Sequence, residues 1–411
     1  MSFSILPHVR PDTPAPALRL TPFPRYNFIG GHNDPESTPV AALQVAADAV
    51  LTREGRTLAT YGLESGPLGY LPLREFLVGK LARHAGIETK ADDILITSGS
   101  LQGLDLVNAL LVSPGDTILI EEDCYGGSIS RLNRLGANII GIPQDAQGLR
   151  VDALAETLAR LQRTGVTPKY LYAIPTIQNP TGSIMPLDRR RALLALAIEA
   201  GIPVVEDDCY ADLVFTGARP PAISALAREA NWDGVIHLGS FSKSIAPALR
   251  VGFLVAGWDI MSRLLALKQD AGSGALEQMV LAEFCTQHFD AHLARLRPAL
   301  KAKADALVAA LAEHFGTAAE FAKPEGGIFL WVTLPDAVDT SRLAAVAAQS
   351  GIAFNAGAEW SVTPLERSTR RLRLCFANPS VDVIMAGVAE LAGVCQREFG
   401  VPARSGNVAR G

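Results

Sequence analysis

Short apolar runs alternate with longer amphipathic stretches through most of the chain. The runs predict buried strands, and stretches with apolar residues at helical spacing predict helices between them. The expected strands cover residues 94–97, 117–121, 138–142, 170–174, 203–206, 235–238 and 251–255. The expected helices between them cover residues 101–111, 128–135, 151–163 and 187–200. This alternation is typical of a mostly parallel sheet covered by helices on both faces.

The two ends of the chain have a different pattern. Residues 1–30 are rich in proline and predict an extended arm, and helices are expected at 39–52 and 71–85. After residue 255 a long helical tract runs from about 260 to 314, with a break near Gly272-Ser273-Gly274, and strands are expected at 326–332 and 372–376. We therefore expect an N-terminal arm (1–30), a large domain (31–295) and a smaller α+β C-terminal domain (296–411). Residues 31–60 would serve the small domain or an interface.

Composition excludes several classes of protein. With 411 residues, 48% hydrophobic and 19% charged, the chain is typical of a globular protein of two domains. A net charge of -5 gives no reason to expect nucleic acid or an anionic membrane as a partner. Five scattered cysteines without a CxxC pair indicate reduced thiols and no metal site. No signal peptide or membrane span is recognisable, so the expected location is cytoplasmic.

One segment after the expected strand at 235–238 gathers side chains that could bind an anion. It reads Gly239-Ser240-Phe241-Ser242-Lys243, and Arg250 opens the next strand. Open sheets place ligands at the carboxyl ends of strands, where Lys243 would stand. Serine hydroxyls and a guanidinium suit a phosphate, and a buried lysine is a candidate Schiff-base nucleophile. Taken alone, the segment fits equally well a solvated loop whose serines cap a turn.

Two further strand ends carry polar or aromatic residues. After 94–97, the sequence Ser98-Gly99-Ser100-Leu101-Gln102-Gly103 opens a helix, whose free N–H groups and dipole would attract an anion. An ordinary capping serine explains the same pattern. After 117–121 comes Tyr125, which would either stack on a planar ring or belong to the core.

The strand ends at 174 and 206 add an amide and a group of acids. Asn179 stands in Gln178-Asn179-Pro180-Thr181-Gly182, and a buried asparagine needs a partner for its amide. Glu206, Asp207 and Asp208 close a buried strand, where three acids are costly unless one is paired with a cation. A pyridinium nitrogen is such a cation. Aspartate for a ring nitrogen, lysine for an aldehyde, and serines, arginine and a helix N-terminus for a phosphate together indicate pyridoxal 5′-phosphate.

As an ordered set, these motifs resemble the class I/II aminotransferases among the fold-type I pyridoxal phosphate enzymes. The set comprises Tyr61, the segment 98–103, Tyr125, Gln178 to Gly182, Glu206 to Tyr210, Gly239 to Lys243, Arg250, and Arg373 to Asn378. It is most similar to the 2-aminoadipate/kynurenine aminotransferase group and to the effector domains of MocR-type regulators. The resemblance implies the α/β fold of type I, with a mostly parallel seven-stranded sheet flanked by helices and a smaller α+β domain.

The resemblance also implies a role for each matching residue. Lys243 would hold the cofactor and move the proton, Asp207 would pair with the ring nitrogen, and Tyr210 and Asn179 would bind the phenolic oxygen. Tyr125 would stack on the ring. The phosphate would be bound by Ser100, the backbone of Leu101 and Gln102, Ser240, Ser242 and Arg250, and by Tyr61 and Ser273 of a neighbouring subunit in a homodimer. Arg373, Asn179 and Gly31 would line the substrate site, with Arg373 gripping the α-carboxylate.

The chain departs from these relatives at two places. They commonly have glutamine where Leu101 stands, which removes a side-chain contact near the phosphate. They also have a helix before the Gly-Gly loop, where this chain has the proline-rich stretch Pro7–Pro24. Arg19, Arg25 or His32 could still bind a second substrate carboxylate, although a solvent-exposed role explains each of them as well.

The expected function is transfer of the amino group of an L-α-amino acid to a 2-oxo acid, with 2-oxoglutarate as acceptor, by a ping-pong mechanism. Arg373 favours this reaction because a carboxylate clamp serves substrates that carry that group. A pyridoxal phosphate lyase, decarboxylase or oxidase remains the alternative. A regulator's ligand-binding domain is not expected, since only about 30 residues precede the match, fewer than a DNA-binding domain needs. A nicotinamide-binding protein is excluded because no GxGxxG follows the first strand.

Overall fold

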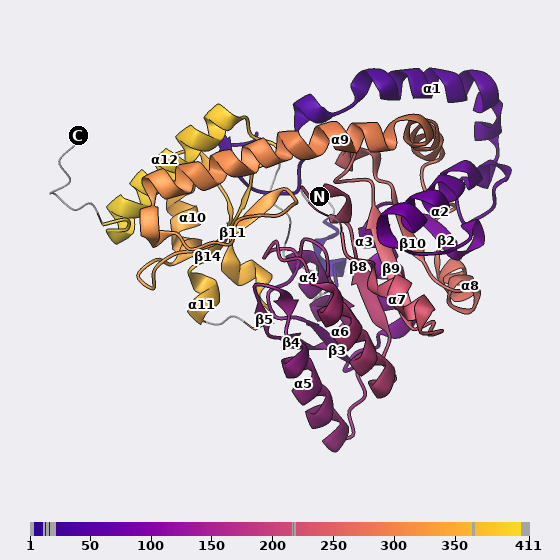
Figure 1. The fold of residues 1–411 in the computed structure, drawn as a ribbon, viewed down its shortest axis with the longest axis horizontal. Coiled ribbons are helices and arrows are strands. Elements are labelled where there is room, and N and C mark those ends of the chain that lie inside the picture. Colours follow the sequence, from indigo (N-terminus) through magenta and orange to yellow (C-terminus); the bar gives the residue numbers. More distant parts are fainter. Residues whose placement is uncertain are drawn as a thin grey trace.

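A seven-stranded sheet forms the centre of the larger part of the molecule (Figure 1). The structure is a computed structural model that describes residues 4–10, 13, 16, 22–215, 217, 219–363 and 366–403. The strands, in their order across the sheet, are β2 (Ile94–Thr97), β10 (Gly252–Val255), β9 (Val235–Ser240), β8 (Val204–Asp207), β7 (Leu171–Ala173), β3 (Thr117–Glu121) and β4 (Asn138–Ile142). β10 runs antiparallel to both neighbours, and the other pairings are parallel. The expected mostly parallel seven-stranded sheet is thus confirmed.

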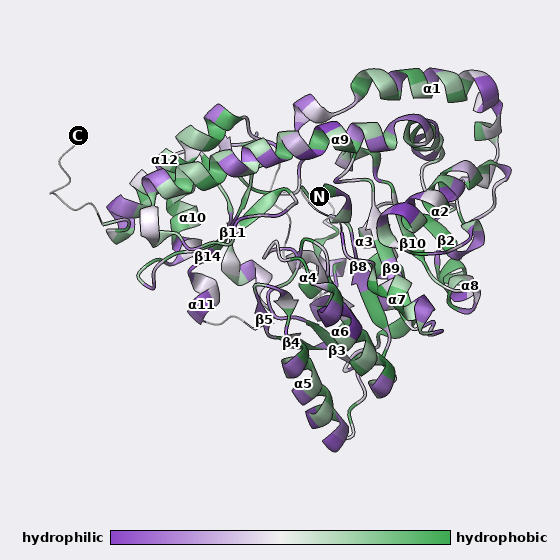
Figure 2. Cartoon of the chain, viewed as in Figure 1, coloured by the Kyte–Doolittle hydropathy of each residue, from purple (hydrophilic) through white to green (hydrophobic). Residues whose placement is uncertain are grey.

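Helices cover both faces of this sheet. They are α2 (Leu71–Ala85), α3 (Ser100–Leu111), α4 (Gly126–Arg134), α5 (Val151–Arg163), α6 (Leu187–Ala200), α7 (Ile223–Glu229) and α8 (Trp258–Leu267). The helix α1 (Val40–Glu54) packs instead on the helix Ala275–His314. Alternate strand residues face opposite layers: Leu95 and Leu254 pack with α3 and α8, whereas Ile96 and Phe253 pack with α2. Figure 2 shows mainly hydrophobic strands β9 and β10, and polar positions along α5.

A second, smaller sheet lies beside the seven-stranded sheet and its helices. It contains β11 (Phe329–Thr333), β14 (Arg371–Cys375) and β13 (Asn355–Ala356), all antiparallel. β1 (Tyr26–Asn27) pairs in parallel with β12 (Ile352–Ala353), and β5 (Gln144–Asp145) pairs with β6 (Gly148–Leu149). The helices of this part are α10 (Thr340–Gln349), α11 (Glu366–Thr369) and α12 (Val381–Phe399). The end of the expected N-terminal arm therefore forms a strand of the C-terminal part.

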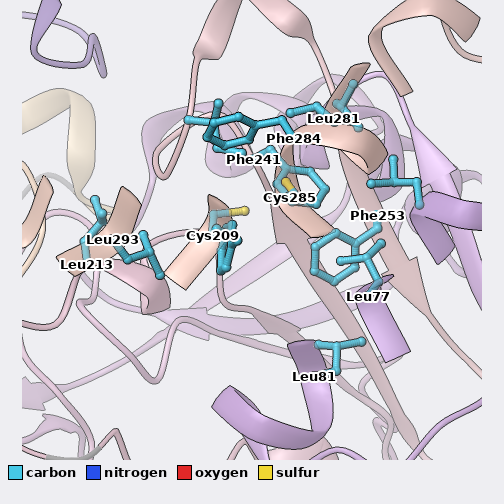
Figure 3. Packing of buried hydrophobic residues seen from close by; sticks show 14 of the residues in the cluster. Leu77, Leu81, Cys209, Leu213, Phe241, Phe253, Leu281, Phe284, Cys285 and Leu293 are labelled. Atoms are coloured by element: carbon cyan, nitrogen blue, oxygen red, sulfur yellow. The ribbon is translucent and has the colours of Figure 1, made fainter. Parts of the chain in front are cut away.

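One long helix, α9 (Ala275–His314), runs through both parts, from α1 and β10 to α12 and β11 (Figure 1). Its first half packs Leu281, Phe284 and Cys285 against Phe253 of the large sheet (Figure 3). Its second half packs Leu307 and neighbouring residues against the small sheet. The expected domain boundary at residue 295 lies inside this helix and stays a prediction.

Several expected elements have the expected bounds, among them α2, α5 and α6. The helical tract expected at 260–314 is divided into α8 and α9 by residues 268–274, around the predicted glycine break. Within the described residues, the helix α7 was not expected, nor were the short strands β1, β5, β6, β12 and β13. Among the described helices, none is long and apolar enough to cross a membrane.

Candidate active site

A cavity of about 300 Å³ opens at the carboxyl ends of β7, β8 and β9. Twelve of the residues expected to form a site line it: Gly31, Ser100, Leu101, Tyr125, Asn179, Asp207, Tyr210, Ser240, Ser242, Lys243, Arg250 and Arg373. They come from loops widely separated in the chain, which the sheet brings to one edge. The other lining residues are Gly30, Ile174, Cys209, Asn355 and Trp360.

Lys243 is the only lysine among the residues that line this cavity. Its Nζ donates a hydrogen bond of 2.8 Å to the Gly31 carbonyl and lies 5.7 Å from the centre of the Tyr210 ring. A Cβ on Gly31 would stand 2.5 Å from Nζ, so glycine gives the amine its space. Burial lowers the pKa of Lys243, and the charges of Arg373 and Arg250 lower it further, whereas Cys375 and Cys209 oppose the shift. The amine is therefore more readily deprotonated and nucleophilic than an exposed lysine.

Asp207 ends β8 and presents a carboxylate to the same cavity. Oδ2 accepts a hydrogen bond of 2.6 Å from the Tyr172 hydroxyl, and Oδ1 accepts one of 3.2 Å from the Cys209 backbone N–H. Burial raises the pKa of Asp207, and these hydrogen bonds oppose that rise. Within the described part of the chain, no salt bridge joins this carboxylate to a cation. A ligand that brings a cationic nitrogen would satisfy it.

The two acids beside Asp207 point to protein partners instead. Glu206 accepts hydrogen bonds from the backbone of Ile223 and Ser224 and pairs with His237 at 3.0 Å. Burial would raise the pKa of Glu206, but His237, the Ser224 N–H and the charge of Arg190 outweigh it and lower this pKa below its ordinary value. Asp208 forms an ion pair with Arg219. Of the three acids that close the strand, Asp207 is thus the one left for a ligand.

One end of the cavity offers donors suited to an anion. Ser100 begins α3, whose free N–H groups face the loop after β2. The Ser240 hydroxyl accepts a 3.0 Å bond from the Ser242 N–H, and Arg250 reaches the Ser242 hydroxyl at 3.5 Å. Hydroxyls, a guanidinium and a helix N-terminus at one place form a donor set that a phosphate would engage.

Arg373 stands on β14 at the opposite side of the cavity and is 3% exposed. It donates to Asn179 Oδ1 at 2.9 Å, to the Gly30 carbonyl at 2.8 Å and to Asn355 Oδ1 at 3.0 Å. Its guanidinium carbon lies 4.0 Å from the centre of the Trp360 ring. Asn179 Nδ2 in turn donates to the Tyr210 hydroxyl at 3.4 Å. A buried guanidinium held in this way is preorganised for a planar carboxylate.

Comparison with known proteins decides the family. A model of the family described as aminotransferase class I and II matches residues 30–391. The chain belongs to the class I and II aminotransferases. The earlier resemblance is confirmed, and with it the fold class and the prediction of an enzyme that transfers amino groups.

Three relatives illustrate the match. A 2-aminoadipate transaminase of Thermus thermophilus is 36% identical over 91% of this chain and 91% of its own length. A helix-turn-helix transcriptional regulator of Bacillus subtilis is 30% identical over 88% of this chain and 72% of its own length. The crystal structure of the α-aminoadipate aminotransferase of Thermus thermophilus, complexed with N-(5′-phosphopyridoxyl)-L-leucine, has a TM-score of 0.84 and 34% identity, and the match covers 91% of this chain and 93% of that one.

The cofactor of this aminotransferase is pyridoxal phosphate. The cavity fits the group chemically: a nucleophilic amine stands at Lys243, an unpaired carboxylate at Asp207 and an anion-binding end at Ser100 and Arg250. The space that Gly31 leaves beside the amine is part of this fit. The prediction of the cofactor is therefore confirmed, whereas the role of each residue stays a prediction.

Two expected cofactor residues lie outside the cavity of this chain. The side chain of Gln102 accepts a bond from the Ser98 N–H at 2.7 Å and donates to Asp270 at 2.5 Å, so only its backbone could face an anion. Tyr61 is 88% exposed and lines a second cavity of about 750 Å³, together with Ser273. A residue at this position would contribute to an active site only in a neighbouring subunit, across an interface between the two subunits.

The three residues considered for binding a second substrate carboxylate lie in different places. Arg19 lies outside the described residues. Arg25 packs over the Tyr26 ring at 5.0 Å and touches the small-domain turn at Gly351. His32 lies over Gly30 at the cavity and its pKa is lowered by burial and by Lys243.

Sequence reasoning missed Asn355, Trp360 and Tyr172. A stacking aromatic residue could have been suspected at Trp360, which comes shortly before the strand of Arg373. Tyr172 and Asn355 carry no such signal.

Proposed function

We propose that this aminotransferase transfers the amino group of an L-α-amino acid to a 2-oxo acid, with 2-oxoglutarate as acceptor, in two half-reactions at Lys243. The observation that carries the proposal is that Arg373 and Lys243 open into one cavity. Arg373 can hold an α-carboxylate while Lys243 acts at the adjacent carbon. Aminotransferases of this family use amino acids and keto acids, and a relative named a 2-aminoadipate transaminase is 36% identical.

Each residue role follows from its place in the cavity. Pyridoxal phosphate, when bound, supplies an electron sink for the bonds at the substrate's α-carbon. Lys243 would hold the cofactor and then move the proton, because its amine lies in the cavity and its lowered pKa makes it more readily deprotonated than an exposed lysine. Asp207 would keep the ring nitrogen protonated. Ser100, Ser240, Ser242 and Arg250, with the backbone of Leu101 and Gln102, would bind the phosphate. Tyr125 would stack on the ring.

The remaining residues would orient the cofactor and the substrate. Asn179 and Tyr210, which are hydrogen-bonded to one another, would bind the phenolic oxygen. Asn179 also fixes Arg373, so one amide would connect the cofactor with the substrate clamp. Gly31 would leave room for the substrate beside Lys243. We keep the arm (1–30), large domain (31–295) and small domain (296–411), and a cytoplasmic location, as proposals.

A homodimer with shared active sites is part of this proposal. Tyr61 is almost fully exposed and lines a cavity with Ser273, outside the site of its own chain. Large apolar side chains nearby are also exposed, including Val45, Leu51 and Leu58. Exposed apolar surface of this kind marks an interface. Light scattering tests whether the protein is a dimer. Tyr61→Phe should weaken cofactor binding without dissociating the dimer.

The first experiment is absorbance spectroscopy of the holoenzyme with a panel of L-amino acids and no acceptor. A productive donor should convert the band of the bound cofactor to the shorter-wavelength band of its amine form, and 2-oxoglutarate should reverse the change. Lys243→Ala should abolish the conversion. Release of ammonia, carbon dioxide or peroxide without conversion would instead support the lyase, decarboxylase or oxidase reaction.

A further inference from the structure

The carboxylate of Asp207 has a neighbour that the proposed function does not use. Tyr172 stands on β7, next to the strand of Asp207, and is 1% exposed. Its hydroxyl donates the 2.6 Å hydrogen bond to Asp207 Oδ2, whereas its side chain is not among those lining the cavity. Burial, followed by the charge of Asp207, raises the pKa of Tyr172 well above its ordinary value. The phenol therefore remains a donor at neutral pH.

We propose that Tyr172 is a positioning residue that keeps Asp207 ionised and aimed at the ring nitrogen of the cofactor. The inference rests on the proposed role of Asp207. One proton is shared between the ring nitrogen and the carboxylate. A donor bound to the carboxylate stabilises its charged form, so the proton stays on the nitrogen. A protonated nitrogen is the better electron sink.

The surroundings of Asp207 explain why such a donor is needed. Burial disfavours its charge, and Asp208 next to it adds a second negative charge that acts in the same direction. The titratable groups that act on Asp207, or on which it acts, are Glu121, Cys124 and Tyr125 from the β3 side, Tyr172 from β7, and Asp208 and Cys209 on its own segment. In this set every group is acidic. The thiol of Cys209, the hydroxyl of Tyr172 and the Cys209 N–H thus oppose protonation of the carboxylate, and of these donors only Tyr172 lies outside the segment of Asp207 itself.

The residue directly before β7 supplies a matched control. Tyr170 stands two residues before Tyr172, packs in the same buried cluster and is fully buried. Its hydroxyl also donates a 2.6 Å hydrogen bond, to Asn108 Oδ1, which does not line the cavity. Tyr170→Phe and Tyr172→Phe therefore remove the same atom and the same kind of bond from one core. Only the second removes a donor to Asp207.

The test uses holoenzyme reconstituted with cofactor labelled with ¹⁵N at the ring nitrogen. Nuclear magnetic resonance at neutral pH reports how much of the shared proton lies on that nitrogen. Since a hydrogen bond to a charged group is comparable to one pKa unit or more, loss of the donor should favour transfer of the proton to the carboxylate about tenfold, so the nitrogen signal of Tyr172→Phe should move toward that of an unprotonated ring. Tyr170→Phe should give the signal of the wild type. Turnover of Tyr172→Phe should fall, with the KM for the amino acid unchanged.

An unshifted nitrogen signal in Tyr172→Phe, or an equal shift in Tyr170→Phe, would overturn the inference. Asp207→Asn separates this failure from that of the proposed function. If Asp207→Asn leaves the protonation of the nitrogen unchanged, the role of Asp207 itself is wrong. If Tyr172→Phe does not fold, Tyr172→Leu takes its place: it also removes the donor and keeps an apolar side chain in the core, so it should give a shift in the same direction, and no shift would overturn the inference.

Discussion

The guanidinium carbon of Arg373 lies 4.0 Å from the centre of the Trp360 ring and 5.2 Å from the centre of the Phe329 ring. The cation is thus held between two aromatic faces while its N–H groups bind Asn179, Gly30 and Asn355. Cation–π attraction and hydrogen bonding act together here, and both fix the plane of the guanidinium. A fixed plane loses less freedom when a carboxylate binds.

Trp360→Leu should raise the KM for the amino acid about five- to tenfold, because it removes a cation–π contact worth about 1 kcal/mol or slightly more. The cofactor affinity should stay close to that of the wild type. Steady-state kinetics and cofactor titration measure both quantities. Trp258→Leu, at an exposed position at the start of α8, is the control. An unchanged KM in Trp360→Leu would show that hydrogen bonds alone hold Arg373.

Arg190→Met should lower the free energy of unfolding by about 3 kcal/mol or more, because it leaves several buried acceptors without donors. The Arg190 side chain is fully buried and donates to the carbonyls of Pro175, Met185 and Pro221. It thereby fixes the start of the loop that carries Asn179. Urea denaturation is the measurement, and the exposed neighbour Arg191→Met should change stability by less than about 0.5 kcal/mol. Similar losses in both variants would contradict this account.

Glu121→Gln should remove a pH dependence of stability. Burial raises the pKa of Glu121 from 4.5 to about 8, although bonds from Gln178 and Ile174 oppose it. Between these two values the folded chain keeps a proton that the unfolded chain releases, so stability falls as pH rises and levels off above about 8.

The advantage of Glu121→Gln over the wild type should therefore grow by up to about 1 kcal/mol per pH unit across that window. Urea denaturation of the cofactor-free protein at several pH values measures it. Glu156→Gln, at an exposed position of α5, should give a curve parallel to that of the wild type. A constant difference between Glu121→Gln and the wild type would show that Glu121 titrates normally in the fold.

Gly252→Ala should weaken cofactor binding about tenfold or more, since a change of about 1.4 kcal/mol in one backbone contact already has this effect. A Cβ at Gly252 would stand 2.5 Å from the backbone nitrogen of Ser100, so β10 and the start of α3 would have to separate. Equilibrium titration of the apoprotein with pyridoxal phosphate measures the loss. Gly257→Ala adds its Cβ in open space and should bind as the wild type does. Equal affinities would mean that the helix start adapts.

The elements that sequence reasoning predicted best are those specified by local pattern. The strands at 94–97, 117–121 and 138–142 are continuous apolar runs, and their bounds agree with β2, β3 and β4. Because parallel strands end at one edge, the gathering of Asp207 and Lys243 could also be anticipated. Pyridoxal phosphate could be predicted as the cofactor without knowing the distances between side chains, because the required groups stand directly after strands.

The parts that could not be predicted depend on contacts between distant segments. Asn355 lies on β13 of the small sheet and Trp360 ends the short helix that follows it, and both meet the cavity only because that sheet packs beside the large one. Tyr172 reads as an ordinary core residue, since alternation indicates which face it occupies and not which acid its hydroxyl meets. The bond from Gln178 to Glu121 joins a loop to the end of β3 in the same way.

The pairing of β1 with β12 has a consequence for synthesis on the ribosome. Tyr26 pairs with Ile352, so β1, the first strand among the described residues, has no partner strand until most of the chain has been translated. The edge strand β2 likewise has no partner strand until β10 has been translated. Non-local pairing of this kind slows folding and leaves unpaired strands exposed in the meantime. A nascent chain that stalls before residue 352 would therefore carry an unfinished small domain, and chaperones would meet the protein chiefly at that stage.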